Sequence, residues 1–144
     1  MQTVNDLLKI KGNQVWSIEY NATIKDALQL MAQKDVGALP VVKNKQLIGI
    51  FSERDYTRKM AQLENRTMTA PVSESMTSKV LYVGLSNSIE DCMKLMTEKH
   101  IRHLPVLEDG KMVGMVSIGD LVKAINTTQT EKISQLENYI YGKW

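Results

Sequence analysis

The chain contains the same sequence pattern twice. When it is shifted by 65 positions, residues 15–60 align with residues 80–125 without a gap, and 12 of the 46 aligned pairs are identical. Thirteen of the other 34 pairs exchange one apolar residue for another, as Ile48 and Val113 do. A repeat of this length predicts two copies of one supersecondary unit, related by a pseudo-two-fold axis. Such a pair is expected to form a cleft between its halves, a place that small ligands favour.

Length and composition limit the classes of protein to which the chain belongs. Its 144 residues, 43% of them hydrophobic, suffice for one compact domain or for two small domains that share a core. The net charge of +2 comes from interspersed acidic and basic residues, which does not indicate a nucleic-acid partner. No apolar run approaches a membrane span, and residues 1–12 lack the apolar core of a signal peptide. The single cysteine, Cys92, cannot form an internal disulfide, so we expect an ordinary soluble cytoplasmic protein.

Each copy predicts the element order strand, helix, strand, strand, helix. The first strands are expected at 15–18 and 80–83, where β-branched and aromatic residues gather. A helix with apolar residues at helical spacing follows each strand, and a hydroxyl residue three positions before an aspartate forms a capping box at its start. These boxes are Thr23 with Asp26 and Ser88 with Asp91.

A β-hairpin and a second helix complete each copy. The hairpin strands are predicted at 39–42 with 47–51, and at 104–107 with 112–116. Asp109-Gly110 favours a type I′ turn, because both central residues need positive φ, and Asn44-Lys45 is a weaker version of the same turn. The second helices are predicted at about 53–63 and 118–125.

The pattern extends beyond the gapless alignment. Residues 4–8 resemble residues 72–76, now at a shift of 68, so the first copy has three extra residues around 11–13. This organisation predicts a first repeat at 3–60, a polar linker at 61–70, a second repeat at 71–125 and an extension at 126–144. In the extension, Ile133, Leu136 and Ile140 predict an amphipathic helix that either caps its own domain or pairs with another chain.

These motifs resemble a tandem pair of CBS domains, the modules named after cystathionine β-synthase. The resemblance rests on a proline-containing strand, a hairpin, and the runs Gly49–Asp55 and Gly114–Asp120, and it covers about residues 3–125. Residues 52–56 and 99–106 are similar to a stand-alone bacterial subgroup of this family. The resemblance implies an α/β (α+β) Bateman module, with two β-α-β-β-α units packed sheet to sheet and two clefts at their junction. It also implies adenosyl ligands such as AMP, ATP, NAD or S-adenosylmethionine, a disc-like homodimer, and regulation of a partner protein without catalysis.

The two Ser-x-x-Asp motifs have a structural and a functional interpretation. As capping boxes, they would only satisfy the first amides of a helix. As binding groups, the same residues lie where free amides and the helix dipole favour phosphate, and a carboxylate can accept hydrogen bonds from a ribose diol. The resemblance assigns Asp55 and Asp120 to ribose and Ser52 and Ser117 to phosphate. Capping and binding can coexist.

The copies diverge beside the proline strands. Arg102-His103 precedes Leu104, whereas Gly37-Ala38 holds the equivalent place in the first copy. An arginine fork suits phosphate oxygens, and a neighbouring histidine can donate a further hydrogen bond. We therefore predict phosphate contacts from Arg102 and His103, with Arg54, which is aligned with a glycine, as a weaker phosphate candidate. The alternative is a solvated arginine and a histidine bonded within the fold.

Other features indicate neither metal nor catalysis. Gly49 and Gly114 either allow another group to approach the backbone closely just before the motifs, or they are required by a β-bulge or by packing. His100 and His103 lie near Cys92 in sequence but in a helix-to-strand transition, which is poor geometry for a metal site. No nucleophile–base arrangement, Walker loop or complete dinucleotide fingerprint is present.

The sequence thus predicts a stand-alone, non-enzymatic sensor that binds an adenine nucleotide in clefts between its repeats. The alternatives are a structural interaction module with vestigial clefts, a sensor of S-adenosylmethionine, and a small enzyme acting on nucleotides. The regulated partner is unknown.

Overall fold

The protein is described here from a computed structural model, and its residues divide into two compact units. The structure describes residues 2–62, 68–127 and 129. One unit, called here the first-repeat unit, consists of Val15–Leu81; the other, the second-repeat unit, combines residues 2–14 with the described residues from 82 onward. The predicted boundaries 3–60 and 71–125 describe the repeat in the sequence, and as domain boundaries they stay a prediction. The two compact units group the residues differently. The predicted helix around Ile133 lies outside the described residues.

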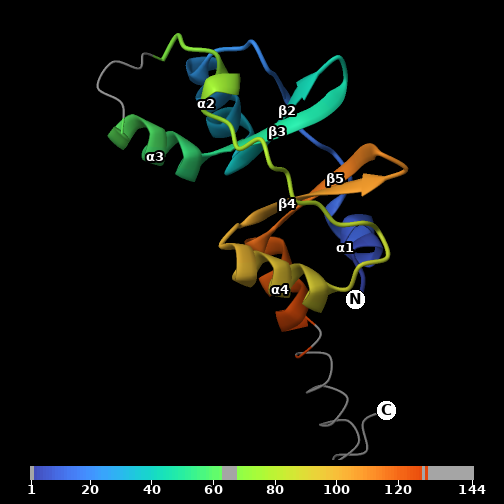
Figure 1. Ribbon diagram of the computed structural model, residues 1–144. Coiled ribbons are helices and arrows are strands. Elements are labelled where there is room, and N and C mark those ends of the chain that lie inside the picture. Colours follow the sequence, from blue (N-terminus) through green and yellow to red (C-terminus); the bar gives the residue numbers. More distant parts are fainter. Residues whose placement is uncertain (1, 63–67, 128, 130–144) are drawn as a thin grey trace, which may run out of the picture. The chain divides into compact units, whose positions relative to one another are not determined.

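The first-repeat unit is a three-stranded sheet with helices packed against it (Figure 1). Its elements are β1 (Ile18–Glu19), α2 (Ile24–Lys34), β2 (Ala38–Lys43), β3 (Gln46–Ser52), α3 (Glu53–Gln62) and the short 3₁₀ helix η1 (Val72–Glu74). Strand β1 runs parallel to β2, and β2 pairs antiparallel with β3. Buried residues from α2, β2, β3 and η1 form one apolar core, so the 3.6-residue pattern of α2 faces the sheet as the sequence predicts.

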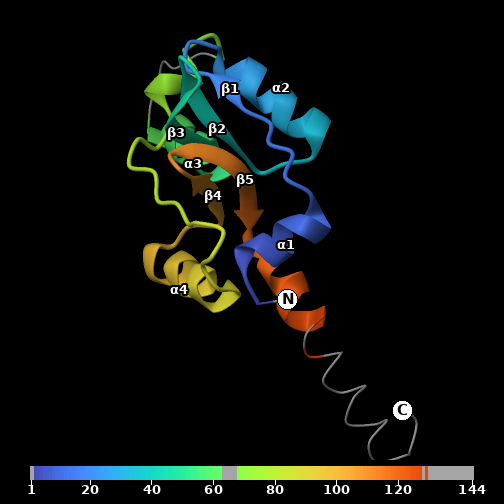
Figure 2. The same ribbon diagram turned by 90° about the vertical axis from the view of Figure 1, so that its right-hand side faces the viewer.

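The second-repeat unit repeats this arrangement with a smaller sheet. Its elements are α1 (Val4–Lys11), α4 (Ile89–Lys99), β4 (His103–Glu108), β5 (Lys111–Ser117) and a helix at 118–127. The three helices gather on one side of the β4–β5 hairpin in both views (Figures 1 and 2). Twelve buried residues from α1, Val83, α4, the hairpin and the helix at 118–127 make its core. No helix in the described ranges is long and apolar enough to cross a membrane.

Turns and helix starts follow the local sequence rules. Thr23 and Ser88 each accept a hydrogen bond from the amide three residues on, and the aspartates at those positions complete both capping boxes. Asn44, Lys45 and Asp109 have positive φ, as does Gly110, so both hairpin turns have the predicted backbone conformation. The capping boxes and the turn conformations are therefore confirmed.

The predicted first strands are much shorter than the sequence indicates. Strand β1 has two residues, Ile18–Glu19, and in the second copy Val83 alone forms a parallel bridge, to Val106. After Val83 the chain turns, because the Gly84 amide donates to Asn87 Oδ1 at 2.8 Å and the Asn87 amide donates back to the Gly84 carbonyl at 3.2 Å. Prediction of a full strand over 80–83 was wrong, since only Val83 pairs with β4, and the turn that follows prevents the strand from continuing beyond Gly84.

The segments that precede the two copies are exchanged. In the second-repeat unit, the Ile89 amide donates to the Gln2 carbonyl at 3.0 Å and the Val4 amide donates to the Asn87 carbonyl at 2.9 Å. The same bonds recur in the first-repeat unit, from Ile24 to Ala70 at 3.0 Å and from Val72 to Ala22 at 2.7 Å. The segment at 4–8 therefore completes the core of the second copy, and the segment at 72–76 completes the core of the first.

Two glycines make room for the exchanged segments. A Cβ atom on Gly114 would lie 2.8 Å from Leu8 Cδ1, and one on Gly49 would meet the Met76 side chain and the Thr77 carbonyl. A register shift also lies beside each glycine, at Val41/Val42 opposite Gly49 in the first copy. Of the interpretations drawn from the sequence, close approach, a bulge and a packing need therefore all apply to these positions.

Candidate functional site

Each Ser-x-x-Asp motif lies at a corner where a strand passes directly into a helix. Strand β3 ends at Ser52 and α3 follows, while β5 ends at Ser117 and the helix at 118–127 follows. Phe51 and Val116, the residues just before the serines, are completely buried and hold the two corners against their cores. The helix dipole places partial positive charge at the start of each helix, so both corners suit an anionic group.

The motifs form capping boxes, as their structural interpretation predicts. At the Asp55 corner, the Ser52 amide donates to Asp55 Oδ2 at 3.0 Å, and the Asp55 amide donates to Ser52 Oγ at 3.1 Å. At the Asp120 corner, the corresponding bonds with Ser117 measure 2.9 and 3.2 Å. Each carboxylate is therefore held in a fixed orientation at its corner. The ribose role of both aspartates and the phosphate role of both serines stay predictions.

Thr77 binds the carboxylate at the Asp55 corner. Its hydroxyl donates to Asp55 Oδ1 at 2.9 Å, and its amide donates to the Ile50 carbonyl of β3 at 2.8 Å. The Ile50 amide donates back to the Thr77 carbonyl at 2.9 Å. The segment after η1 is thus hydrogen-bonded to β3, and the neutral side chain of Thr77 contacts the carboxylate at this corner.

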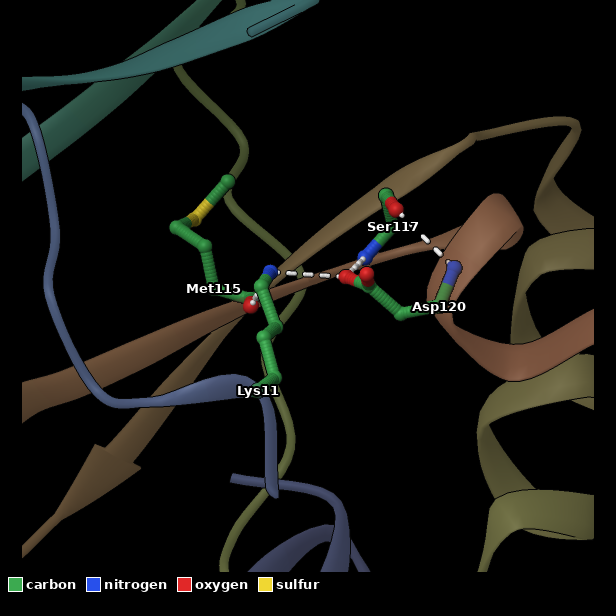
Figure 3. A network of polar contacts seen from close by, with 4 residues as sticks. All are labelled: Lys11, Met115, Ser117 and Asp120. Carbon is green, nitrogen blue, oxygen red and sulfur yellow. Dashed lines mark hydrogen bonds and ion pairs between the residues drawn. The ribbon is translucent and has the colours of Figure 1, made fainter. Parts of the chain in front are cut away.

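Lys11 occupies the corresponding place at the Asp120 corner (Figure 3). Its Nζ atom donates to Asp120 Oδ2 at 2.7 Å and to the Met115 carbonyl of β5 at 2.6 Å. Met115 is the equivalent of Ile50 in the repeat. One ammonium group therefore contacts both the carboxylate and the strand carbonyl, as the hydroxyl and the amide of Thr77 do in the other unit, but it binds Oδ2 whereas Thr77 binds Oδ1.

A difference in helix length explains how a lysine reaches this corner. The helix η1 covers three residues, Val72–Glu74, whereas α1 continues from the equivalent position for a further turn, to Lys11. The extra turn ends at Lys11, the first residue of the three-residue insertion that the repeat alignment predicts around 11–13. The two corners therefore differ in charge, because an ammonium replaces a hydroxyl.

The environment of Asp120 lowers the pKa of its carboxyl. Burial by itself raises that pKa, but the hydrogen bond from Lys11, the amide of Ser117 and the charge of Lys11 together outweigh burial. The side chain of Asp120 is 20% exposed and that of Lys11 is 33% exposed. The carboxylate is therefore ionised at neutral pH and available as an acceptor near the surface.

The predicted basic pair lies at the Asp120 corner. His103 is paired with Ser117 in the β4–β5 register, and the Arg102 carbonyl accepts a hydrogen bond of 2.9 Å from the Ile118 amide. In the first-repeat unit the equivalent bond runs from Glu53 to the Gly37 carbonyl at 3.1 Å. The sequence position of Arg102 and His103 thus places them beside Asp120, while glycine and alanine stand beside Asp55.

Arg54, the other residue predicted to bind phosphate, lies in the first turn of α3, one residue before Asp55. Arg54 is exposed. Arg54 and His103 both take part in polar interactions within the protein. Their phosphate roles, like that of Arg102, stay predictions.

Sequence reasoning missed Lys11 and Thr77. Both lie outside the gapless alignment of 15–60 with 80–125, and Lys11 belongs to the insertion itself. The resemblance of 4–8 to 72–76 was the available signal, because it places both residues just after matching segments. It does not say on which copy each segment packs.

The cysteine and histidines do not assemble into a metal site among the described residues, where no group of three or more His, Cys, Asp or Glu side chains gathers. Cys92 belongs to the core of the second-repeat unit. Burial raises the pKa of its thiol to about 11, and the charge of Asp91 adds to this shift. The thiol is therefore protonated at neutral pH, which is unfavourable for a nucleophile or a ligand.

Comparison with known proteins agrees with this geometry. The family model described as "CBS domain" matches the chain twice, at residues 4–62 and 72–127. The CBS domain-containing protein CBSX3, mitochondrial, of Arabidopsis thaliana is 38% identical over 97% of this chain and 72% of its own length.

Two solved structures have a similar fold. The crystal structure of the CBS domain NE2398 is 48% identical, with a TM-score of 0.82 over 85% of this chain and 96% of its own. The crystal structure of CBSX2 in complex with AMP is 30% identical, with a TM-score of 0.73 over 90% of this chain and 99% of its own. The CBS domain family accounts for both the duplicated sequence and the mixed α and β fold. The chain belongs to this family, as a tandem pair of CBS domains.

Proposed function

We propose that the chain is a non-catalytic regulatory module that binds an adenine nucleotide, with Asp55 and Asp120 accepting hydrogen bonds from the ribose hydroxyls. AMP, ATP and NAD are the candidate ligands, and S-adenosylmethionine is the alternative. The single observation that carries the proposal is the presence of two equivalent carboxylates, each held at a helix N-terminus by its own serine. The complex of CBSX2 with AMP supports the ligand class.

Chemistry gives each corner a consistent division of roles. A carboxylate accepts from both hydroxyls of a ribose, and the positive end of a helix dipole favours a phosphate. Ser52 and Ser117 then contribute hydroxyls, while Arg102, His103 and Arg54 supply donors for phosphate oxygens. Binding regulates a partner only if the ligand prefers one conformation or assembly of the protein over another.

Matched aspartate variants separate binding from capping. Asp120 and Asp91 both occupy the third position of a capping box, but only Asp120 lies at a proposed binding corner. Asp120→Asn is expected to weaken AMP binding by more than about tenfold, because a charged acceptor is lost. Asp91→Asn should leave AMP affinity unchanged in the same calorimetric titration. Equal losses in both variants, or no loss in either, would refute the ribose role of Asp120.

One observation favours a purely structural module as the second candidate. Both carboxylates already accept hydrogen bonds within the protein, from their serines and from Thr77 or Lys11. That reading predicts no thermal stabilisation by AMP, ATP, NAD or S-adenosylmethionine, whereas a ligand that binds only the folded state raises the melting temperature. Native mass spectrometry of freshly purified protein tests the predicted homodimer and any co-purified nucleotide in one measurement.

A further inference from the structure

We propose that Lys11 makes the Asp120 corner selective for a phosphate-bearing nucleotide over the bare nucleoside. In this structure its ammonium occupies an acceptor position on Asp120 Oδ2, so a ribose diol that uses both carboxylate oxygens displaces Lys11, whose ammonium then takes a new anionic partner. The inference rests on the proposed function, because it assumes that Asp120 binds ribose. It adds a specificity-determining residue that the repeat pattern does not contain.

The hydrogen-bonding capacity of Asp120 creates the competition. Each carboxylate oxygen accepts about two hydrogen bonds. Oδ2 of Asp120 already accepts one from the Ser117 amide and one from Lys11 Nζ. A diol that uses both carboxylate oxygens therefore takes the position that Lys11 holds, since the Ser117 amide is fixed by the backbone.

Lys11 is anchored at its base, and its side chain reaches the surface. It lies in the last turn of α1, whose residues Val4, Leu7 and Leu8 are buried in the core of the second-repeat unit. Its own side chain is 33% exposed. A displaced ammonium group therefore stays near the corner, because the helix cannot move without disrupting the core, while the four-carbon stem can change rotamer.

The charge balance then discriminates between ligands. Adenosine would replace an ion pair by neutral hydroxyl contacts and leave the Lys11 ammonium without its anion. AMP or ATP brings its own anion, so the ammonium exchanges a carboxylate for a phosphate. Arg102 lies at the same corner and has the same sign of charge, which adds to the preference for phosphate.

The Asp55 corner provides an internal comparison. There a neutral hydroxyl, that of Thr77, contacts the carboxylate. A ribose that displaces Thr77 breaks no ion pair, so Thr77 does not contribute to a preference for AMP over adenosine, and any such preference at this corner depends on Arg54. The two corners of one chain are therefore expected to differ in their response to phosphate.

Calorimetric titration with adenosine, AMP and ATP tests this at one corner at a time. An Asp55→Asn background reports on the Asp120 corner. In it, Lys11→Met should lower the AMP-to-adenosine affinity ratio by about tenfold, as expected for the loss of a charge-assisted contact. Lys11→Arg should keep the ratio within about threefold, because arginine retains the positive charge. A small change is expected because the planar guanidinium differs in shape from the compact ammonium group.

Matched controls exclude indirect effects. Lys9→Met removes the same charge from the same helix turn and should leave the ratio unchanged. In an Asp120→Asn background, Thr77→Val should change the ratio by less than about twofold, because no charge is removed. Circular dichroism melting confirms that each variant is folded.

The outcomes separate the two hypotheses. If the Asp55→Asn protein binds AMP but Lys11→Met leaves the ratio unaltered, the selectivity role of Lys11 is overturned and the ribose role of Asp120 stands. If Lys9→Met lowers the ratio as much as Lys11→Met, the effect is one of overall charge and the inference also fails. If the folded Asp55→Asn protein binds neither AMP nor adenosine, the proposed function at this corner fails, and the inference with it.

Discussion

Lys11 Nζ lies 2.7 Å from Asp120 Oδ2, although the two residues are 109 positions apart in the chain. This ion pair joins the first helix of the chain to the last motif of its second repeat. It is possible because the segment at 4–8 packs on the second copy, not on the copy that it precedes in sequence. The same exchange brings Thr77 to Asp55 in the first-repeat unit.

The ion pair predicts a pH dependence of stability. Because the pKa of Asp120 is lower in the folded protein than its ordinary value of 3.8, its ionised form stabilises the fold at neutral pH. That contribution is complete above the ordinary value and is lost as the pH falls through the folded pKa. Lys11→Met is expected to raise the pKa of Asp120 and to cost at most about 1 kcal/mol near neutral pH, since the pair is partly exposed.

Carboxyl carbon chemical shifts of Asp120 measure the pKa, and urea denaturation measures the stability. Lys9→Met serves as the control, because it lies in the same turn of α1. Wild type and Lys11→Met should converge in stability at strongly acidic pH. An unchanged pKa in the variant would mean that the ion pair does not form in solution.

Close packing of α1 on β5 predicts that Gly114→Ala destabilises the protein. The added methyl group would lie 2.8 and 2.9 Å from the two terminal carbons of Leu8. Overpacking of this kind costs about 1–3 kcal/mol in a well-packed core. Leu8→Ala also destabilises by opening a cavity, but in the double variant the two changes compensate. Additive losses in a denaturation double-mutant cycle would contradict the contact.

The two hairpin turns predict a stabilising substitution. Lys45 has φ of 63°, a left-handed conformation that is unfavourable for a residue with a Cβ, whereas glycine holds the matching place at position 110. Lys45→Gly should therefore stabilise the protein by about 0.5–1 kcal/mol, within the penalty for a left-handed residue. Gly110→Lys is the reciprocal control and should destabilise. A lower melting temperature for Lys45→Gly would show that the lysine side chain contributes more than its backbone strain costs.

Local rules made part of this structure predictable. A capping box joins residues three apart, as in Ser88 and Asp91, and a type I′ turn requires only that two adjacent residues accept positive φ. The hairpin registers follow from those turns, so β2–β3 and β4–β5 are found where the sequence places them. The shortening of the strand at 80–83 was not foreseen, because β propensity does not say which residues find a partner strand, and only Val83 does so.

The candidate site shows the same division. The placement of Ser52, Asp55, Ser117 and Asp120 at the starts of helices was predicted, while their binding roles, like that of Arg102, stay predictions. Lys11 and Thr77 were not predicted at these corners, because each reaches its carboxylate from a segment far away in the chain or outside the alignment.

The sequence by itself determined the duplication, the element order, the caps and the turns, since each depends on residues a few positions apart. Only the tertiary structure decided which core each leading segment completes. Residues 4–8 and 72–76 both have an apolar residue at each end, so this pattern by itself does not decide between the two pairings. The exchange observed here is selected by packing across the whole chain, through Leu8 against Gly114 and Met76 against Gly49, and it places a charged residue at one corner and a neutral one at the other.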